Sequence, residues 1–418
     1  MNIKNKNLYY IGGVVRDELL GKESFDIDLT YQGDAIEFAK NLPDTEILRI
    51  NEPFGTVKIK IDDKEIDIAS TRNEIYPQKG HLPKVNNIGC SLKEDILRRD
   101  FTINAMAKST LTGEIIDYTN GLEDIKNKKL RVLHDKSFID DPTRIVRGLK
   151  FSVRFGFELD KHTKKLQDEY LQNINYDMSY KRLKKELVET FNLNSQQAFE
   201  KFINDGIYKL ISPIEFTLPT INLENLISKY KPIYPWIIYI GLLPDISSLP
   251  LTKTEQKIVD DYKKIALSLC ESGFAYVLSE ASPDSEQNMP TGAMLRRQDF
   301  ASMEQIQDRE QLCLSLAKTT NAGEGFISDF EIYKAFERVK IESIIMFATI
   351  NTEIATRYLD TLRHIKPEIT GKDLQEIGIT PSAQYTEIFD FILSEKLKNP
   401  ALNKTQEIEL VKKFYLIP

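Results

Sequence analysis

The chain has little cysteine, histidine or tryptophan and contains no long apolar run. Its three cysteines, Cys90, Cys270 and Cys313, form neither a C-x-x-C pair nor a metal-ligand spacing, which argues against a structural zinc site or a disulfide framework. The longest apolar stretch, residues 234–243, is too short to cross a bilayer, and residues 1–7 are too polar for a signal peptide. These shortages predict a cytoplasmic protein with reduced thiols and no membrane partner.

Charged residues, in contrast, are abundant. Among 418 residues, 56 Lys and Arg stand against 63 Asp and Glu, which gives a formal net charge of −7. With 41% hydrophobic and 28% charged residues, the composition is typical of a globular protein with two to four domains. The acidic balance argues only weakly against a nucleic-acid partner, because the net charge of a whole chain does not describe its local patches.

Two kinds of pattern divide the sequence. Up to about residue 135, short β-branched runs alternate with helical stretches, and residues 57–69 predict a hairpin. Beyond that point apolar residues recur at three- and four-residue spacing, which predicts helices. We therefore expect an α+β fold: a mixed-sheet head (1–135), then an all-helical neck (136–190), body (191–330) and tail (331–418). Residues 272–328 contain a single lysine, and the sequence leaves their role open.

A glycine pair opens the first predicted helix. Gly12 and Gly13 directly follow the apolar run 8–11 and precede Arg16. Glycines permit close backbone approach, a helix N-terminus offers free N–H groups to a phosphate, and Arg16 could add a bidentate contact. A tight strand-to-helix turn without any ligand explains the pair equally well.

Two carboxylates follow on the next predicted strand. Asp26 and Asp28 are two residues apart, so both side chains project from the same face. Such a pair suits two divalent ions that activate a hydroxyl and clamp a phosphate, although an isolated Asp-x-Asp pair is usually a solvated strand face. Coming so soon after a glycine turn, the pair favours a nucleotidyltransferase site.

Further motifs follow in order along the chain. The segments are Gly12–Asp17 with Asp26 and Asp28, Asp67–Arg72, a loop at 77–87, Arg98–Ala107, Asp117–Ile125, Asp140–Arg147 and Ile369–Pro381. With them the sequence resembles the bacterial tRNA nucleotidyltransferase / poly(A) polymerase family, the class II CCA-adding enzymes of the DNA polymerase β superfamily. The resemblance is specific over residues 1–190 and about 365–400.

The resemblance implies roles for individual residues. Asp26 and Asp28 would bind two Mg²⁺ ions, and Asp67 is a candidate third catalytic carboxylate that would deprotonate the attacking 3′ hydroxyl. An exposed strand aspartate explains Asp67 equally well. The residues expected to contact the incoming nucleotide are Gly12, Gly13, Arg16, Asp17, Arg99, Asp100, Asn104, Asp141, Arg144, Arg147 and Lys150.

Within that set, Asp141 and Arg144 are expected to read the base. They lie three apart on a helix that Pro142 is expected to begin, and they present an acceptor beside a fork of donors. Cytosine and adenine both offer a donor next to an acceptor, whereas guanine and uracil present a mismatched edge. Arg147 would support the pair, and a local helix salt bridge is the alternative interpretation of these two residues.

The sequence departs from the family pattern at three positions. Asp140 stands where glutamate is usual, Lys150 where a third arginine is frequent, and Lys181 where a helix-start motif has glutamate. Lysine contacts phosphate without the bidentate geometry of arginine. Basic residues gather at 150–185 and 396–413, where they could follow an RNA backbone or form solvated helix faces.

The expected function is therefore addition of the 3′-terminal CCA, or part of it, to tRNA from CTP and ATP with Mg²⁺, through contact with the tRNA acceptor arm. Alternatives are an A-adding enzyme, a poly(A) polymerase, or a non-catalytic RNA-binding protein on the same scaffold. A CC-adding enzyme is disfavoured because the loop 73–95 is full length. The nucleotides added and the oligomeric state are left open.

Overall fold

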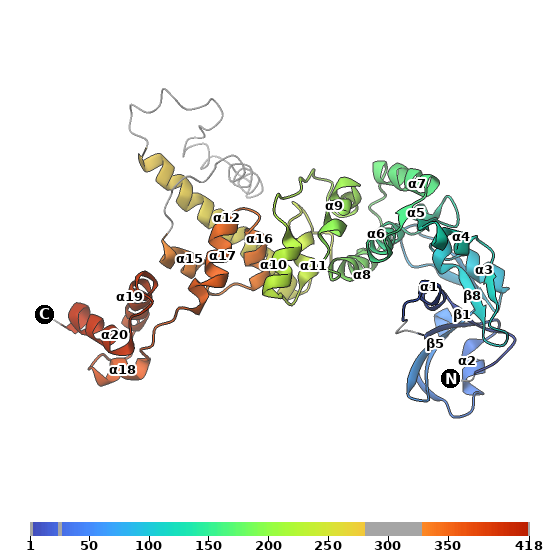
Figure 1. The fold of residues 1–418 in the computed structure, drawn as a ribbon, viewed down its shortest axis with the longest axis horizontal. Coiled ribbons are helices and arrows are strands. Elements are labelled where there is room, and N and C mark those ends of the chain that lie inside the picture. Colours follow the sequence, from blue (N-terminus) through green and yellow to red (C-terminus); the bar gives the residue numbers. More distant parts are fainter. Residues whose placement is uncertain (1–2, 24–26, 281–327, 417–418) are drawn as a thin grey trace, which may run out of the picture. The chain divides into compact units, whose positions relative to one another are not determined.

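The computed structural model describes residues 3–23, 27–280 and 328–416, the side chains of 268–280 excepted (Figure 1). Contacts within the chain divide it into two compact units: residues 1–218 with 243–250, and residues 219–242 with 251–418. Asp26 and most of the segment 272–328 lie outside the described residues. The domain boundaries expected near 135, 190 and 330 stay predictions.

The first unit begins with a seven-stranded mixed sheet in the order β3-β4-β5-β2-β1-β8-β9. Strands β2 and β5 pair in parallel, and the other neighbouring pairs are antiparallel. The sheet, followed by helices, confirms the α+β expectation. The strands are β1 (Leu8–Ile11), β2 (Ile27–Tyr31), β3 (Glu46–Asn51), β4 (Thr56–Ile61), β5 (Lys64–Ser70), β8 (Met106–Ser109) and β9 (Ile115–Asp117).

The expected hairpin joins β4 and β5. The register pairs Ile61 with Lys64, which leaves Asp62 and Asp63 as a two-residue loop. Both loop residues have positive φ, 49° and 60°, as a type I′ turn requires. The turn matches the twist of the strands and so fixes which residues of β5 face the core.

One face of the sheet is buried and the other carries polar side chains. Leu29, Ile66 and Ile68 pack with Ala35 and Ala39 of helix α2 (Ala35–Lys40) in one hydrophobic cluster. Because side chains alternate along a strand, Asp28 and Asp67 point to the opposite face. Burial on one side thus places the carboxylates on the accessible side.

The remaining elements of the sheet region surround that accessible side. They are α1 (Gly13–Leu19), the hairpin of β6 (Arg72–Ile75) and β7 (Lys84–Ile88), α3 (Leu92–Leu97), η2 (Thr102–Asn104) and α4 (Gly121–Lys126). The loop of the β6–β7 hairpin docks on the helices that follow, since Gly80 donates its N–H to Asp140 O at 3.0 Å and accepts from Ser179 N at 3.0 Å. The hairpin is therefore held at both its base and its tip.

Helices complete the first unit. They are α5 (Ser137–Asp140), α6 (Thr143–Phe155), α7 (Lys161–Gln172), α8 (Tyr180–Phe191), α9 (Gln196–Asn204) and η3 (Ile207–Leu210), and a short strand, β11 (Glu158–Leu159), pairs with β10 (Lys129–Leu130). Helix α6 follows Pro142 directly and ends at Gly156, whose φ of 69° suits glycine. Its fully buried Ile145 and Val146 anchor it, so its polar face is held at a fixed orientation.

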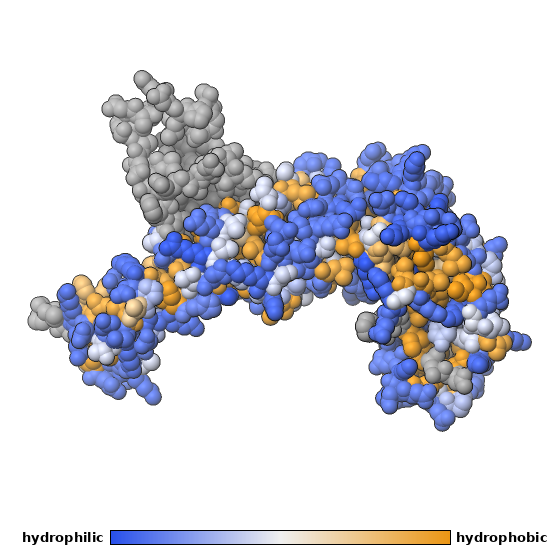
Figure 2. Space-filling model, in the orientation of Figure 1, coloured by the Kyte–Doolittle hydropathy of each residue, from blue (hydrophilic) through white to orange (hydrophobic). Residues whose placement is uncertain are grey.

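The second unit is helical in its described part. Its elements are α10 (Leu223–Tyr230), α11 (Pro235–Ile240), α12 (Lys253–Glu280), α15 (Asp329–Phe336), α16 (Ile341–Phe347), α17 (Thr352–Asp360), η5 (Leu362–His364), α18 (Gly371–Glu376), α19 (Gln384–Lys398), α20 (Lys404–Val411) and η6 (Lys412–Leu416). Among the described residues, no helix is both long and apolar enough to span a membrane. Hydrophilic residues cover most of the described surface on the face drawn in Figure 2.

One lysine of the tail cluster, Lys396, is buried. Lys396 is 5% exposed, and its ammonium contacts Glu407 at 2.7 Å and Glu368 at 2.8 Å. Glu407, fully buried, also accepts the backbone N–H groups of Glu368 and Ile369. This ion cluster ties α19 and α20 to the segment before α18, so Lys396 stabilises the fold instead of facing a partner.

Candidate active site

A hollow of about 930 Å³ in the first unit is lined by side chains of the sheet region and of α6 and α8. It brings together eleven of the residues named from the sequence: Gly12, Gly13, Arg16, Asp28, Arg99, Asp100, Asn104, Asp141, Arg144, Arg147 and Lys150. Asp17 and Asp67 do not line it, and Asp26 is outside the described residues. Nine cationic and six acidic side chains line the hollow, so it is positive although the chain is acidic.

The glycine turn brings the backbone close to an arginine. Gly12 has a φ of 73°, and its N–H donates to Met106 O at 3.3 Å. A Cβ at this position would lie 3.3 Å from Arg99 Nη1. The positive φ therefore favours glycine, and a Cβ would in addition press on the end of the Arg99 side chain.

The two described carboxylates of the sheet stand side by side. Asp28 of β2 is in register with Asp67 of β5, and in a parallel pair such residues share one face. Asp28 is exposed and lines the hollow, whereas Asp67 Oδ2 lies 3.0 Å from Lys58 Nζ. Carboxylate oxygens are the ligands that Mg²⁺ prefers, so the donor chemistry fits a divalent ion. Within the described residues, no group of three or more His, Cys, Asp or Glu side chains forms a metal cluster.

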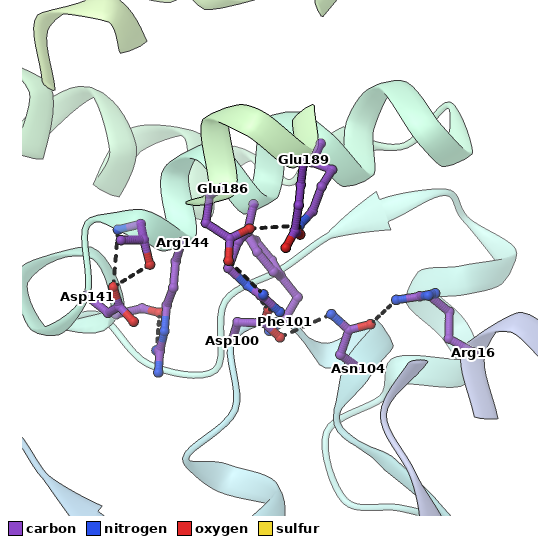
Figure 3. A network of polar contacts seen from close by, with 12 residues as sticks. Arg16, Asp100, Phe101, Asn104, Asp141, Arg144, Glu186 and Glu189 are labelled. Carbon is purple, nitrogen blue, oxygen red and sulfur yellow. Dashed lines mark hydrogen bonds and ion pairs between the residues drawn. The ribbon is translucent and has the colours of Figure 1, made fainter. Parts of the chain in front are cut away.

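A chain of hydrogen bonds links α1 to α6 across the hollow (Figure 3). Arg16 Nη1 donates to Asn104 Oδ1 at 2.5 Å, and Asn104 Nδ2 donates to Asp100 Oδ1 at 3.1 Å. Asp100 Oδ2 in turn accepts from Arg147 Nε at 2.8 Å and from Nη2 at 2.5 Å. Arg16 is also held by two hydrogen bonds to Asp17 Oδ1, which makes Asp17 a support behind the hollow. These residues form one rigid wall.

Electrostatics fix the charge states along this wall. Burial opposes ionisation of Asp100, but the charges of Arg147 and Arg144 and the hydrogen bond from Arg147 outweigh it and lower the pKa of Asp100. Burial likewise acts to lower the pKa of Arg147, and the charges of Asp100 and Glu186 overcome it, so this pKa is raised. Asp100 is therefore an anion and Arg147 a cation at all ordinary pH values.

Asp141 and Arg144, the candidates for reading the base, adopt a different geometry from the expected one. Asp141 has an extended backbone (φ −146°, ψ 92°) before Pro142, so it precedes helix α6 and does not share it with Arg144. Asp141 Oδ1 accepts from Thr143 Oγ1 at 2.6 Å, and Oδ2 accepts from Arg182. Between these two described residues, Asp141 and Arg144, no ion pair forms, which removes the local salt bridge as an explanation.

Neutral acceptors hold Arg144. Its Nη1 donates to Ser137 Oγ at 2.7 Å, and its Nη2 donates to Arg98 O at 3.1 Å and Tyr76 Oη at 3.3 Å. The guanidinium is buried, at 4% exposure. It is thus positioned without being neutralised, and its positive charge remains directed into the hollow.

Lys150 is engaged by two acids of α8. Its Nζ contacts Glu186 Oε2 at 2.7 Å and Glu189 Oε2 at 2.6 Å, and the residue is 8% exposed (Figure 3). Glu186 also accepts from Arg147 at 3.3 Å. The sequence predicts a triphosphate contact at Lys150. In the structure, two carboxylates already balance the charge of this lysine.

Sequence reasoning missed several residues of the hollow. Arg72, Arg98 and Glu74 form one network on its wall, in which Glu74 Oε1 accepts from both arginines at 2.8 and 3.0 Å. Arg72 and Arg98 belong to the Asp67–Arg72 and Arg98–Ala107 motifs, which assigned neither of them a role in the site, whereas Glu74 has no distinctive signal in the sequence. Arg182 and Glu186 lie in the helix-start motif that begins at Lys181. That motif predicted a helix but did not predict that these two side chains line the hollow.

Comparison with known proteins supports the interpretation of this geometry. Residues 8–131 match the family model described as the poly A polymerase head domain. A curated A-adding tRNA nucleotidyltransferase of Geobacter sulfurreducens is 30% identical over 416 residues, 96% of this chain and 44% of that protein. One from Halalkalibacterium halodurans is 27% identical over 421 residues, 98% of this chain and 89% of that protein. The chain thus spans less than half the length of the Geobacter relative.

Solved structures share the fold. The apo form II of a CCA-adding enzyme aligns with a TM-score of 0.72 at 23% identity, covering 97% of this chain and 91% of that one. The Thermotoga maritima CCA-adding enzyme complexed with tRNA aligns with a TM-score of 0.67 at 24% identity, covering 97% and 90%. Residues 8–131 therefore form a poly A polymerase head domain on a carboxylate-bearing sheet. Along its whole length the chain is similar to bacterial tRNA nucleotidyltransferases and shares the fold of CCA-adding enzymes.

Proposed function

We propose that this chain adds 3′-terminal nucleotides of the CCA end to tRNA, with ATP and CTP as nucleotide substrates. The observation that carries the proposal is that the exposed Asp28 and the base-reading candidates Asp141 and Arg144 line one hollow. Such a site can hold a nucleotide with its base at Arg144 and its α-phosphate beside Asp28, which leaves the terminal phosphates to the other cations that line the hollow. A tRNA substrate would place the activity in the cytoplasm.

In this proposal, the 3′ hydroxyl of the RNA attacks the α-phosphate and pyrophosphate leaves. A divalent ion, when bound, would lower the pKa of that hydroxyl and offset the charge of the phosphates. Asp28, with Asp26 two residues before it, would hold the ions. Asp67, side by side with Asp28, would accept the hydroxyl proton, and Lys58 would orient its carboxylate.

The wall of the hollow would position the nucleotide. Asn104 and Asp100 are fixed by hydrogen bonds to Arg16 and Arg147, so they present their remaining hydrogen-bonding capacity in a constant geometry to the sugar. Arg144 would offer to the acceptor of a base those N–H groups that do not already donate to Ser137, Tyr76 or the carbonyl of Arg98. Asp141 would accept from the exocyclic amine of cytosine or adenine after it exchanges its hydrogen bond with Arg182.

A-addition alone is the second candidate. Two curated relatives that match nearly the whole chain, those of Geobacter and Halalkalibacterium, are A-adding enzymes, whereas a CCA-adding enzyme of Bacillus pumilus matches 50% of the chain at 32% identity. The sequence left this alternative open, and these two relatives support it without changing the chemistry of the site.

One experiment tests both candidates. Purified protein would be offered tRNA that lacks the CCA end, tRNA that ends in CC, and complete tRNA, each with CTP, ATP or both. Addition of C and then A supports CCA synthesis, and A added only to the CC-ending tRNA supports the A-adding candidate. A long run of A would support a poly(A) polymerase. No incorporation under any condition would refute an enzymatic function.

A further inference from the structure

The ring of Phe155, at the end of α6, is surrounded by three cations. Arg16 Cζ lies 4.5 Å, Lys22 Nζ 4.9 Å and Arg154 Cζ 5.2 Å from the ring centroid. The electron-rich face of an aromatic ring attracts cations, which explains how the three can gather there. The ring offsets only a small part of their mutual repulsion.

Most cations of the hollow are balanced by a neighbouring acid. Arg16 pairs with Asp17, and the other paired cations are Arg72, Arg98, Arg99, Arg147, Lys150 and Arg182. Arg154, which lines the hollow, and Lys22, which lies on the same ring outside the lining, differ, because no carboxylate among the described residues pairs with either and both are exposed. Two unbalanced cations on one aromatic ring form a site that favours an anion.

The charge of Arg154 acts on its surroundings. Burial is the main cause that lowers the pKa of Arg16, and the charge of Arg154 acts in the same direction, against the hydrogen bond and charge of Asp17. An anion bound between Lys22 and Arg154 would relieve this repulsion. Both cations are exposed, so an anion can reach each of them.

The position along α6 indicates which anion belongs there. Arg144, Arg147 and Arg154 all line the hollow, and ten residues of helix separate Arg144 from Arg154 by roughly 15 Å. A nucleotide whose base lies at Arg144 would extend its phosphates along the helix toward Arg154. Lys150, the alternative cation on this helix, is already engaged by Glu186 and Glu189.

We propose that Lys22 and Arg154, held on the ring of Phe155, bind the terminal phosphates of the incoming nucleoside triphosphate. This assignment rests on the proposed function, because it takes the base to lie at Asp141 and Arg144. The sequence suggested Lys150 for the phosphate contact, and this proposal assigns that contact to Lys22 and Arg154 instead. The same pair would hold pyrophosphate before its release.

Binding measurements on the full chain test the site without relying on catalysis. Isothermal titration of ATP and of inorganic tripolyphosphate would be compared for wild type, Lys22→Gln, Arg154→Gln and Arg154→Lys. Lys165→Gln is the matched control, because Lys165 is an exposed lysine of the same unit that pairs with Glu169 at 3.6 Å. We expect Lys22→Gln and Arg154→Gln to weaken binding of both ligands about tenfold each, the loss of one charge-assisted hydrogen bond. Arg154→Lys should retain part of the affinity, and Lys165→Gln all of it.

The outcomes separate this proposal from the proposed function. Unchanged affinity for ATP and tripolyphosphate in both glutamine variants, with wild-type unfolding temperatures, would overturn the site. A raised KM for tRNA with unchanged affinity for both phosphate ligands would assign the cations to the RNA backbone and overturn the nucleotide assignment. Wild-type protein that binds ATP but adds no nucleotide to tRNA would refute the proposed function, while a loss of affinity in Arg154→Gln would still support the site.

Discussion

Arg147 of α6 donates two hydrogen bonds, at 2.8 and 2.5 Å, to a single oxygen of Asp100, which precedes η2. Asp100 is 8% exposed, so its charge is stabilised chiefly by this arginine. The pair fastens the helix that carries Arg144 to the segment that carries Asn104. Together with the hydrogen bond from Arg144 to the carbonyl of Arg98, this ion pair fixes the relative position of the base-reading and sugar-binding candidates.

Replacing Arg147 should destabilise the protein and weaken nucleotide binding together. Arg147→Ala leaves a buried carboxylate unpaired, and we expect it to lower the free energy of unfolding by about 3 kcal/mol. Urea unfolding and the KM for ATP measure the two effects. Lys129→Ala is the control, because Lys129 pairs with the exposed Glu158 at 3.2 Å, and losing such an exposed pair should cost at most about 1 kcal/mol. Equal losses in both variants would contradict the special role of Arg147.

The lowered pKa of Asp100 predicts a dependence of stability on pH. A carboxyl whose pKa is lower in the folded state contributes stability that is complete above its unfolded pKa of about 3.9 and is lost as the pH falls through the folded pKa. Asp100→Asn removes this contribution. We expect the difference in unfolding free energy between wild type and Asp100→Asn to be constant from pH 8 to about 5 and to shrink below about pH 4. A difference that grows on acidification would contradict the sign of the shift.

Asp28 should be required for chemistry but not for folding. Asp28→Ala removes an exposed carboxylate, so the unfolding temperature should be unchanged, whereas incorporation into tRNA should fall on the order of 10³-fold, as when a transition-state stabiliser is lost. Filter binding should show that tRNA affinity persists. Glu65→Gln is the control, since Glu65 is an exposed acid of β5 that pairs with Lys58 outside the hollow. Retained incorporation in Asp28→Ala would remove Asp28 from the proposed metal site.

The sequence was sufficient for features that depend on local patterns. Alternation of buried and exposed residues predicted the strand faces, and the two aspartates of the 62–63 loop allowed the hairpin turn. Ordered motifs identified eleven residues that line one hollow. These residues are recognisable from sequence because each belongs to a short motif of neighbouring residues.

Contacts between distant segments could not be predicted in this way. Lys150 meets Glu186 and Glu189 through the packing of α6 on α8, and Tyr76 meets Arg144 across 68 residues of sequence. Spacing alone placed Asp141 on a helix, but the extended backbone before Pro142 moved it out of α6. The tail lysines left both an RNA-binding surface and a solvated helix face open, and the burial of Lys396 between two glutamates depends on contacts with distant segments that spacing does not reveal.

Arg144 should control which nucleotide is chosen. Its guanidinium is held by Ser137, Tyr76 and the carbonyl of Arg98, so Arg144→Ala removes a positioned set of donors without breaking an ion pair among the described residues. A well-formed contact to a base edge is worth about 1–3 kcal/mol of discrimination, which is roughly a 5- to 150-fold change. We expect the ratio of kcat/KM for ATP to kcat/KM for GTP to decrease by a factor within this range in Arg144→Ala.

The measurement must separate nucleotide choice from RNA binding. Steady-state kinetics with ATP, CTP and GTP on CC-ending tRNA would be run beside tRNA binding by filter retention for wild type, Arg144→Ala and Arg131→Ala. We expect tRNA affinity to change less than twofold in both variants and nucleotide choice to change only in Arg144→Ala, because Arg131 pairs with Asp124 and Asp160 and does not line the hollow. If selectivity were unchanged while tRNA affinity fell, Arg144 would be an RNA-binding residue and the base-reading role would have to move to other residues of the wall.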